Sequence, residues 1–78
     1  MKKVVMPKMG ITMESATITQ WFKKIGDSVQ QGEDLFEIET EKSTLPIESA
    51  YTGTLKEILA QEGEEAEVDT ELAVIEEA

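Results

Sequence analysis

The sequence predicts an all-β fold made of two similar four-stranded halves packed face to face, and three observations lead to this prediction. Short segments of alternating or β-branched apolar residues recur along the chain, as they do in half-buried strands. Turn signals separate these segments at intervals close to the roughly 8–12 residues expected of a small sandwich or barrel. The chain also contains a weak internal repeat, which implies two copies of one unit related by an approximate twofold axis.

Six segments have the composition of strands, and turn residues lie between them. The segment around Leu55 and Leu59 could alternatively form one helical turn, but Gly53 and Gly63 bound a window too short for a helix. We therefore expect at most a short 3₁₀ turn, and we interpret Gly53 as a turn position that needs a permissive backbone. The expected strands are Lys3–Met6, Ala16–Trp21, Leu35–Thr40, Thr44–Glu48, Thr54–Leu59 and Leu72–Ile75.

The internal repeat appears when the chain is displaced by 37 residues, which aligns Ala16–Glu39 with Gly53–Glu76. Five of the 24 aligned positions are identical, among them Gly26 with Gly63 and Leu35 with Leu72. A single four-stranded half cannot bury its apolar face alone, whereas two halves packed together can.

Composition excludes several classes of function. The chain has 78 residues, with 7 Lys, no Arg, 17 Asp plus Glu and a formal charge of −10. This length suits one small domain rather than a multi-domain enzyme, and without Cys or His there is no thiol nucleophile, disulfide, histidine base or Cys/His zinc site. The negative charge disfavours nucleic acid and anionic membrane surfaces as partners, and no stretch approaches the roughly 20 apolar residues of a membrane span. We expect a module that binds or carries something and has no active site of its own.

The segment Ile38–Glu48 is the most informative part of the chain. Leu45 and Ile47 follow its polar centre with the period of a strand, which predicts a β-hairpin. Glu41 and Lys42 would lie at the tip, and Thr40 and Ser43 would flank it in a four-residue turn. Pro46 then lies on the face opposite Leu45 and Ile47, at an edge position where its missing N–H is tolerated.

The predicted hairpin projects the amine of Lys42 away from the body of the domain. A lysine at an exposed turn is ordinary, and the nearby glutamates at 37, 39, 41 and 48 favour its cation. A protonated amine is a poor nucleophile. If Lys42 has a special role, a separate enzyme must modify it, so the lysine is a candidate modification site rather than a catalytic residue.

Trp21 and three methionines are interpreted as structural. Trp21 is expected to pack between the sheets rather than to serve as a ligand platform. Met6, Met9 and Met13 are expected to be core or loop residues, because the proline at position 7 and the glycine at position 10 interrupt any helix.

These segments together resemble the lipoyl domain, a member of the biotinyl/lipoyl attachment family, of 2-oxo acid dehydrogenase acyltransferases. The resemblance covers nearly the whole chain, and its centre is Ile38-Glu39-Thr40-Glu41-Lys42-Ser43. The other matching blocks are Met6-Pro7-Lys8-Met9-Gly10-Ile11-Thr12-Met13-Glu14, Trp21 to Val29, Gly32 to Leu35, Gly53 to Ile58, Glu62-Gly63 and Leu72 to Ile75.

The resemblance implies a flattened barrel-sandwich hybrid of two four-stranded antiparallel sheets, with lipoic acid joined to Lys42 by an amide. It implies a carrier that moves acyl groups and reducing equivalents between a thiamine-diphosphate-dependent dehydrogenase, an acyltransferase core and dihydrolipoamide dehydrogenase. A lipoyl ligase or a lipoyl/octanoyl transferase would attach the group. The Gly-Ile-Thr-Met-Glu segment favours a pyruvate or acetoin complex over an oxoglutarate complex.

The sequence departs from the family at two places. The usual Asp-Lys-Ala at the tip is Glu41-Lys42-Ser43 here, and the usual Glu-Gly-Thr is Glu14-Ser15-Ala16. Biotinyl domains place Met on both sides of the lysine, a pattern that Glu41 and Ser43 do not fit. A biotinyl carrier of a carboxylase or decarboxylase and an unmodified barrel-sandwich adaptor remain the alternatives.

The resemblance also sets expectations about the whole protein. Residues 1–78 are expected to form a single domain, the N-terminal part of a longer acyltransferase chain. The expected location is the cytoplasm of a bacterium, or an organelle matrix if a transit peptide was removed.

Overall fold

A computed structural model describes residues 1–10 and 13–78, and every regular element in this part of the chain is a β-strand. Ile11 and Thr12, which belong to the first matching block, lie outside the described residues. No helix long and apolar enough to cross a membrane occurs among the residues described. The strands are β1 (Lys2–Val5), β2 (Ser15–Trp21), β3 (Ser28–Val29), β4 (Asp34–Glu39), β5 (Thr44–Glu48), β6 (Gly53–Ile58), β7 (Glu65–Glu67) and β8 (Glu71–Glu77).

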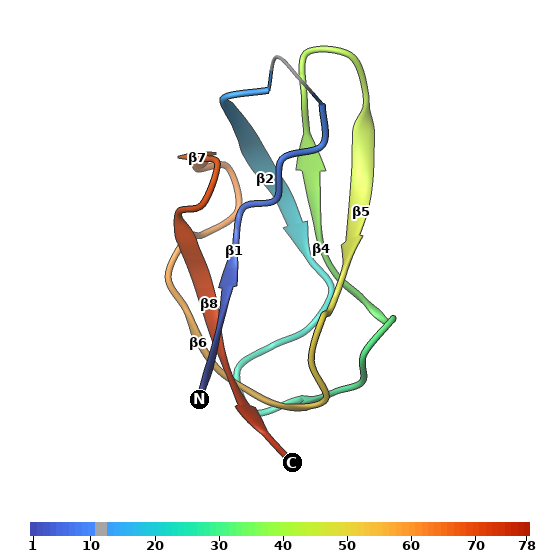
Figure 1. The fold of residues 1–78 in the computed structure, drawn as a ribbon, viewed down its shortest axis with the longest axis vertical. Coiled ribbons are helices and arrows are strands. Elements are labelled where there is room, and N and C mark those ends of the chain that lie inside the picture. The colour runs from blue at the N-terminus through green and yellow to red at the C-terminus, as the bar shows by residue number, and fades with distance from the viewer. Residues whose placement is uncertain (11–12) are drawn as a thin grey trace.

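The strands form two four-stranded antiparallel sheets, as predicted, in the orders β1-β8-β6-β3 and β5-β4-β2-β7. The sheets remain separate in their strand pairing, so the flattened sandwich is not a closed barrel. The molecule is elongated, with principal extents of 34 × 21 × 18 Å. In Figure 1 the chain ends lie at the bottom of the long axis, and the β4–β5 hairpin turns at the top.

Two of the eight strands were not recognised among the strand segments of the sequence. β3 has two residues and β7 has three, too few to show a periodic pattern. Each contributes one buried apolar side chain, Val29 or Ala66, and each pairs with a longer strand of its own sheet, β3 with β6 and β7 with β2. The alternative of a helical turn near Leu55 is wrong, because that segment is β6 and pairs with β8.

Hydrogen bonds confirm the internal repeat. Gly26 N–H donates to the Leu55 carbonyl at 2.7 Å, and the equivalent Gly63 N–H donates to the Ile18 carbonyl at 2.6 Å. Both glycines have positive φ angles, 97° and 91°, which side chains with a Cβ rarely adopt. The acid that follows each glycine accepts a bond from the backbone N–H three residues earlier, Lys24 to Asp27 at 2.9 Å and Gln61 to Glu64 at 3.1 Å. The two halves therefore share a backbone path as well as a few identical residues.

Gly53 is not the turn residue that the sequence suggested. It is the buried first residue of β6, its φ angle is not positive, and it pairs with Val29 and Glu77 on its two sides. A Cβ built on Gly53 would overlap the backbone carbonyl oxygen of Glu76 and lie 2.8 Å from the carbonyl carbon of that residue. A glycine is needed here because β8 approaches too closely for any side chain.

The core lies between the sheets and holds the base of the β4–β5 hairpin. Leu35, Phe36 and Ile38 of β4 are fully buried. Trp21 packs on Phe36 with ring centroids 5.0 Å apart, and its indole N–H donates to the Ala60 carbonyl at 2.9 Å. This confirms Trp21 as a packing residue. Because Ile38 is buried two residues before the turn, the hairpin leaves the body from a fixed base.

Candidate functional site

The site is the tip of the β4–β5 hairpin, where the structure places Lys42 as predicted. The strands pair from Asp34 with Glu48 to Glu39 with Thr44, and the hairpin closes with Thr40 N–H donating to the Ser43 carbonyl at 2.8 Å. Four residues, 40–43, therefore form the tip. Pro46 is exposed on β5, which is the edge strand of its sheet, so its missing N–H is tolerated there as expected.

The side chain of Thr40 organises this tip, a role that our interpretation of the sequence missed. Its hydroxyl oxygen accepts hydrogen bonds from the N–H groups of Lys42 at 3.3 Å and Ser43 at 3.1 Å. The hydroxyl also lies 3.0 Å from the Ser43 carbonyl, to which it donates. A threonine two or three residues before exposed turn amides is a known turn-forming pattern, so this signal was present in the sequence.

Lys42 is exposed and forms no ion pair among the residues that the structure describes. None of the nearby glutamates at 37, 39, 41 and 48 forms a salt bridge with it. Glu37 instead accepts a hydrogen bond from the Thr19 hydroxyl at 2.8 Å. Four other lysines do form ion pairs, namely Lys2, Lys3, Lys23 and Lys56.

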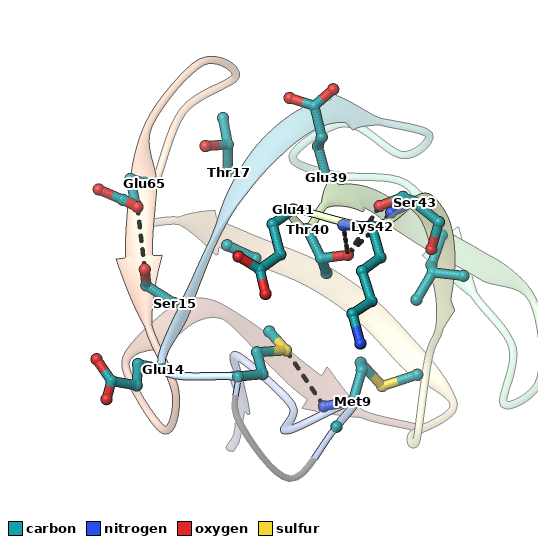
Figure 2. A pocket seen from close by; sticks show the side chains of 14 residues that line it. Met9, Glu14, Ser15, Thr17, Glu39, Thr40, Glu41, Lys42, Ser43 and Glu65 are labelled. Carbon is teal, nitrogen blue, oxygen red and sulfur yellow. Dashed lines mark hydrogen bonds between the residues drawn. The ribbon is translucent and has the colours of Figure 1, made fainter.

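A groove of about 830 Å³ adjoins the tip, and Lys42 is part of its lining. Figure 2 shows the Lys42 side chain extending toward the loop that carries Met9. Met9 is 49% exposed, so it is not a core residue, whereas Met13 packs partly against the core. The Met13 sulfur accepts a hydrogen bond from the Met9 N–H at 3.3 Å, which links these two residues directly. The groove is thus lined by apolar side chains and by acidic ones. The acidic side chains, which include Glu41, form what we call its acidic rim.

The chemistry available at the tip is that of an accessible amine. Acylation of Lys42 would break no ion pair with any residue that the structure describes, and the open groove beside it leaves room for an attached group. The described residues contain no group of three or more Asp or Glu side chains placed to hold a metal ion. The residues present therefore fit a covalent amide-linked group on Lys42, with Glu41 and Ser43 on either side.

Known proteins are similar to this chain over nearly its whole length. The family model described as "Biotin-requiring enzyme" matches residues 2–75. The chain is 42% identical over 73 residues to the dihydrolipoyllysine-residue acetyltransferase component of the acetoin cleaving system of Bacillus subtilis, covering 94% of this chain and 18% of that protein. It is 39% identical over 75 residues to the dihydrolipoyllysine-residue succinyltransferase component of the 2-oxoglutarate dehydrogenase complex of Staphylococcus saprophyticus, covering 96% of this chain and 18% of that protein.

A solved structure gives the same result at the level of the fold. The lipoyl domain of the 2-oxoglutarate dehydrogenase complex from Azotobacter vinelandii superimposes with a TM-score of 0.78 at 25% identity, covering 96% of this chain and 95% of that one. The chain spans less than a fifth of the length of the two acyltransferase components named above. Since the family model covers nearly all of the sequence, and the structure has the sandwich of a lipoyl domain with a lysine at its hairpin tip, the chain belongs to the biotin/lipoyl attachment family.

Proposed function

We propose that this chain is a lipoyl carrier domain in which Lys42 is joined to lipoic acid through an amide. The observation that carries the proposal is the exposed amine of Lys42 at the tip of a hairpin whose base is buried, without an ion pair among the described residues. Amide formation removes one positive charge and moves the formal charge from −10 to −11. The bound lipoyl group would supply a dithiolane for redox and acyl-transfer chemistry, which a chain without cysteine cannot provide itself.

The protein's own residues contribute position rather than catalysis. Strands β4 and β5 project Lys42, Glu41 and Ser43 flank it, and the rest of the domain serves as a rigid support. The domain itself has no active site in this proposal. Tethering on a mobile domain raises the effective concentration of the carried group at each partner enzyme, without any new contact.

The partners follow from the proposed chemistry. We propose a thiamine-diphosphate-dependent dehydrogenase that acylates the carrier, an acyltransferase core that accepts the acyl group, and dihydrolipoamide dehydrogenase that restores the oxidised form. A lipoyl ligase or a lipoyl/octanoyl transferase would modify Lys42. We place the domain in the N-terminal part of a longer acyltransferase of the pyruvate or acetoin type, in bacterial cytoplasm or an organelle matrix. The acetoin-system and 2-oxoglutarate components match this chain about equally, at 42% and 39% identity, so this choice rests on the Gly-Ile-Thr-Met-Glu segment.

Mass spectrometry tests the proposal directly. The chain is produced in cells with and without an active lipoyl ligase, and intact mass is followed by peptide mapping. A lipoyl group on Lys42, present only with the ligase, is the expected result. A biotinyl group on Lys42 would instead identify a biotinyl carrier, and an unmodified Lys42 in ligase-competent cells would favour the adaptor; either result overturns the proposal.

The acidic rim of the groove leads to a prediction about docking. If the dehydrogenase component docks with a basic surface, as steering by this rim requires, Glu41→Lys should lower the rate constant for its acylation reaction by about three- to fivefold at low salt, because reversing a charge at the edge of an interface acts mainly on the rate of association. The difference should disappear at high ionic strength, where exposed charges are screened. The measurement is kcat/KM for acylation of the lipoylated domain across a salt series.

A matched variant separates steering from net charge. Glu57→Lys changes the net charge by the same amount, but Glu57 is exposed in the other sheet and does not line the groove. Equal salt-dependent losses in both variants, or none in Glu41→Lys, would refute steering by Glu41.

A further inference from the structure

We infer that the hydroxyl of Thr40 presents Lys42 to the enzyme that modifies it, which makes Thr40 a positioning residue for lipoylation. The inference rests on the proposed function, because it concerns how Lys42 is recognised as the substrate amine. It concerns a side chain that does not itself react.

The hydrogen bonds of the tip single out this hydroxyl. In an ordinary four-residue turn, the carbonyl of the first residue accepts the N–H of the fourth. Here Ser43 N–H donates to the Thr40 hydroxyl oxygen at 3.1 Å, and Lys42 N–H donates to the same atom at 3.3 Å. The hydroxyl hydrogen is directed to the Ser43 carbonyl at 3.0 Å. One donor and two acceptor sites are all that a hydroxyl has, so its capacity is fully used within the tip.

Little else holds the two residues at the tip. Glu41 and Lys42 are exposed, and the last buried side chain of β4 is Ile38. Two hydrogen bonds therefore hold the backbone at Lys42. Its own N–H donates to the Thr40 hydroxyl, and the Thr40 N–H donates to the Ser43 carbonyl across the turn. Loss of the hydroxyl would leave both amide groups to water and let the tip sample other turn conformations.

The order of the tip matters because the modifying enzyme must select one lysine among seven. If only a fraction of molecules presents the tip correctly, the apparent affinity falls by that fraction. The expected signature is a higher KM for the domain with an unchanged kcat. A loss of chemical reactivity would lower kcat instead.

The experiment compares variants as substrates of a lipoyl ligase. Thr40→Val keeps the β-branched shape and removes the hydroxyl, and it should raise KM about fivefold, as expected for losing hydrogen bonds of about 1 kcal/mol. Thr40→Ser keeps the hydroxyl and should stay within about twofold of the wild-type KM. Thr40→Ala, which also lacks the hydroxyl, provides a second removal variant.

A matched control lies at the other end of the molecule. The Thr52 hydroxyl also accepts a bond from an exposed backbone N–H, that of Gln31 at 3.0 Å, while its own carbonyl bonds to Ala78 near the chain end. Thr52→Val therefore loses a comparable bond far from Lys42 and should leave KM unchanged. An equal rise in KM for Thr52→Val would show a general effect on stability and overturn the inference, as would a wild-type KM in Thr40→Val.

Nuclear magnetic resonance separates this inference from the proposed function. Amide exchange of Lys42 and Ser43 in the unmodified domain should become faster in Thr40→Val and remain slow in Thr40→Ser. Unchanged exchange in Thr40→Val would refute the role of the hydroxyl, whether or not Lys42 is lipoylated. A wild-type domain that no ligase modifies would instead refute the proposed function.

Discussion

Replacing Lys42 by arginine should abolish lipoylation and leave the fold unchanged. Arginine keeps the positive charge but remains protonated at any pH at which proteins are studied, so it offers no amine nucleophile for an amide. Because Lys42 is exposed and forms no ion pair within the described part of the chain, the free energy of unfolding should change by less than about 0.5 kcal/mol. Intact mass after incubation with a lipoyl ligase and urea denaturation measure the two effects.

Lys24→Arg is the control for this prediction. Lys24 is exposed, lies between β2 and β3 away from the groove, and has no salt-bridge partner among the residues described. This variant should be modified to the same extent as the wild type. Retained lipoylation in Lys42→Arg, or its loss in Lys24→Arg, would show that the modified residue is not Lys42.

Gly53→Ala should remove much of the stability of the domain. The new methyl group would meet backbone atoms of Glu76 and Glu77, including the Glu77 Cα at 2.9 Å. Backbone atoms cannot rotate away as the end of a side chain can, so β6 and β8 must separate locally. Overpacking of this kind costs roughly 2–3 kcal/mol, whereas a core of this size supplies only about 3–5 kcal/mol. Urea unfolding followed by Trp21 fluorescence measures the loss.

Gly10→Ala is the matched control, because the same substitution there meets open space. Among the described residues other than its chain neighbours, no atom lies within 4 Å of a Cβ on Gly10, and Gly10 does not have a positive φ angle. The free energy of unfolding of the Gly10→Ala variant should stay within about 0.5 kcal/mol of the wild-type value. Equal stability of the two alanine variants would show that the close approach of β6 and β8 relaxes without cost.

Much of the fold could be predicted because its pattern is local. Alternation of apolar and polar side chains marks the longer strands, and Pro46 indicates an edge position. The 37-residue repeat predicted the approximate twofold symmetry, and it extends beyond identical residues. Gly32 aligns with Asp69, and both have positive φ angles, 93° and 72°. A similar backbone path can therefore persist where the side chains differ.

One departure from strict alternation needed the structure to explain it. Leu35 and Phe36 are adjacent in sequence, yet both are buried. The pairing of β4 with β5 shifts between Asp34 and Phe36, and such a bulge turns successive side chains to the same side. The equivalent neighbours Leu72 and Ala73 at the start of β8 are likewise both buried. A two-residue alternation alone gives no sign of such bulges.

By itself, the sequence determined that the chain is all-β and that a hairpin carries Lys42 at its tip, because both follow from the order of neighbouring residues. Only the tertiary structure decided features that depend on distant segments. The strands β3 and β7 exist because β6 and β2 offer them backbone partners. Gly53 is required because β8 passes close to it. Contacts of this kind join residues far apart in the chain, and no local pattern records which segments will meet.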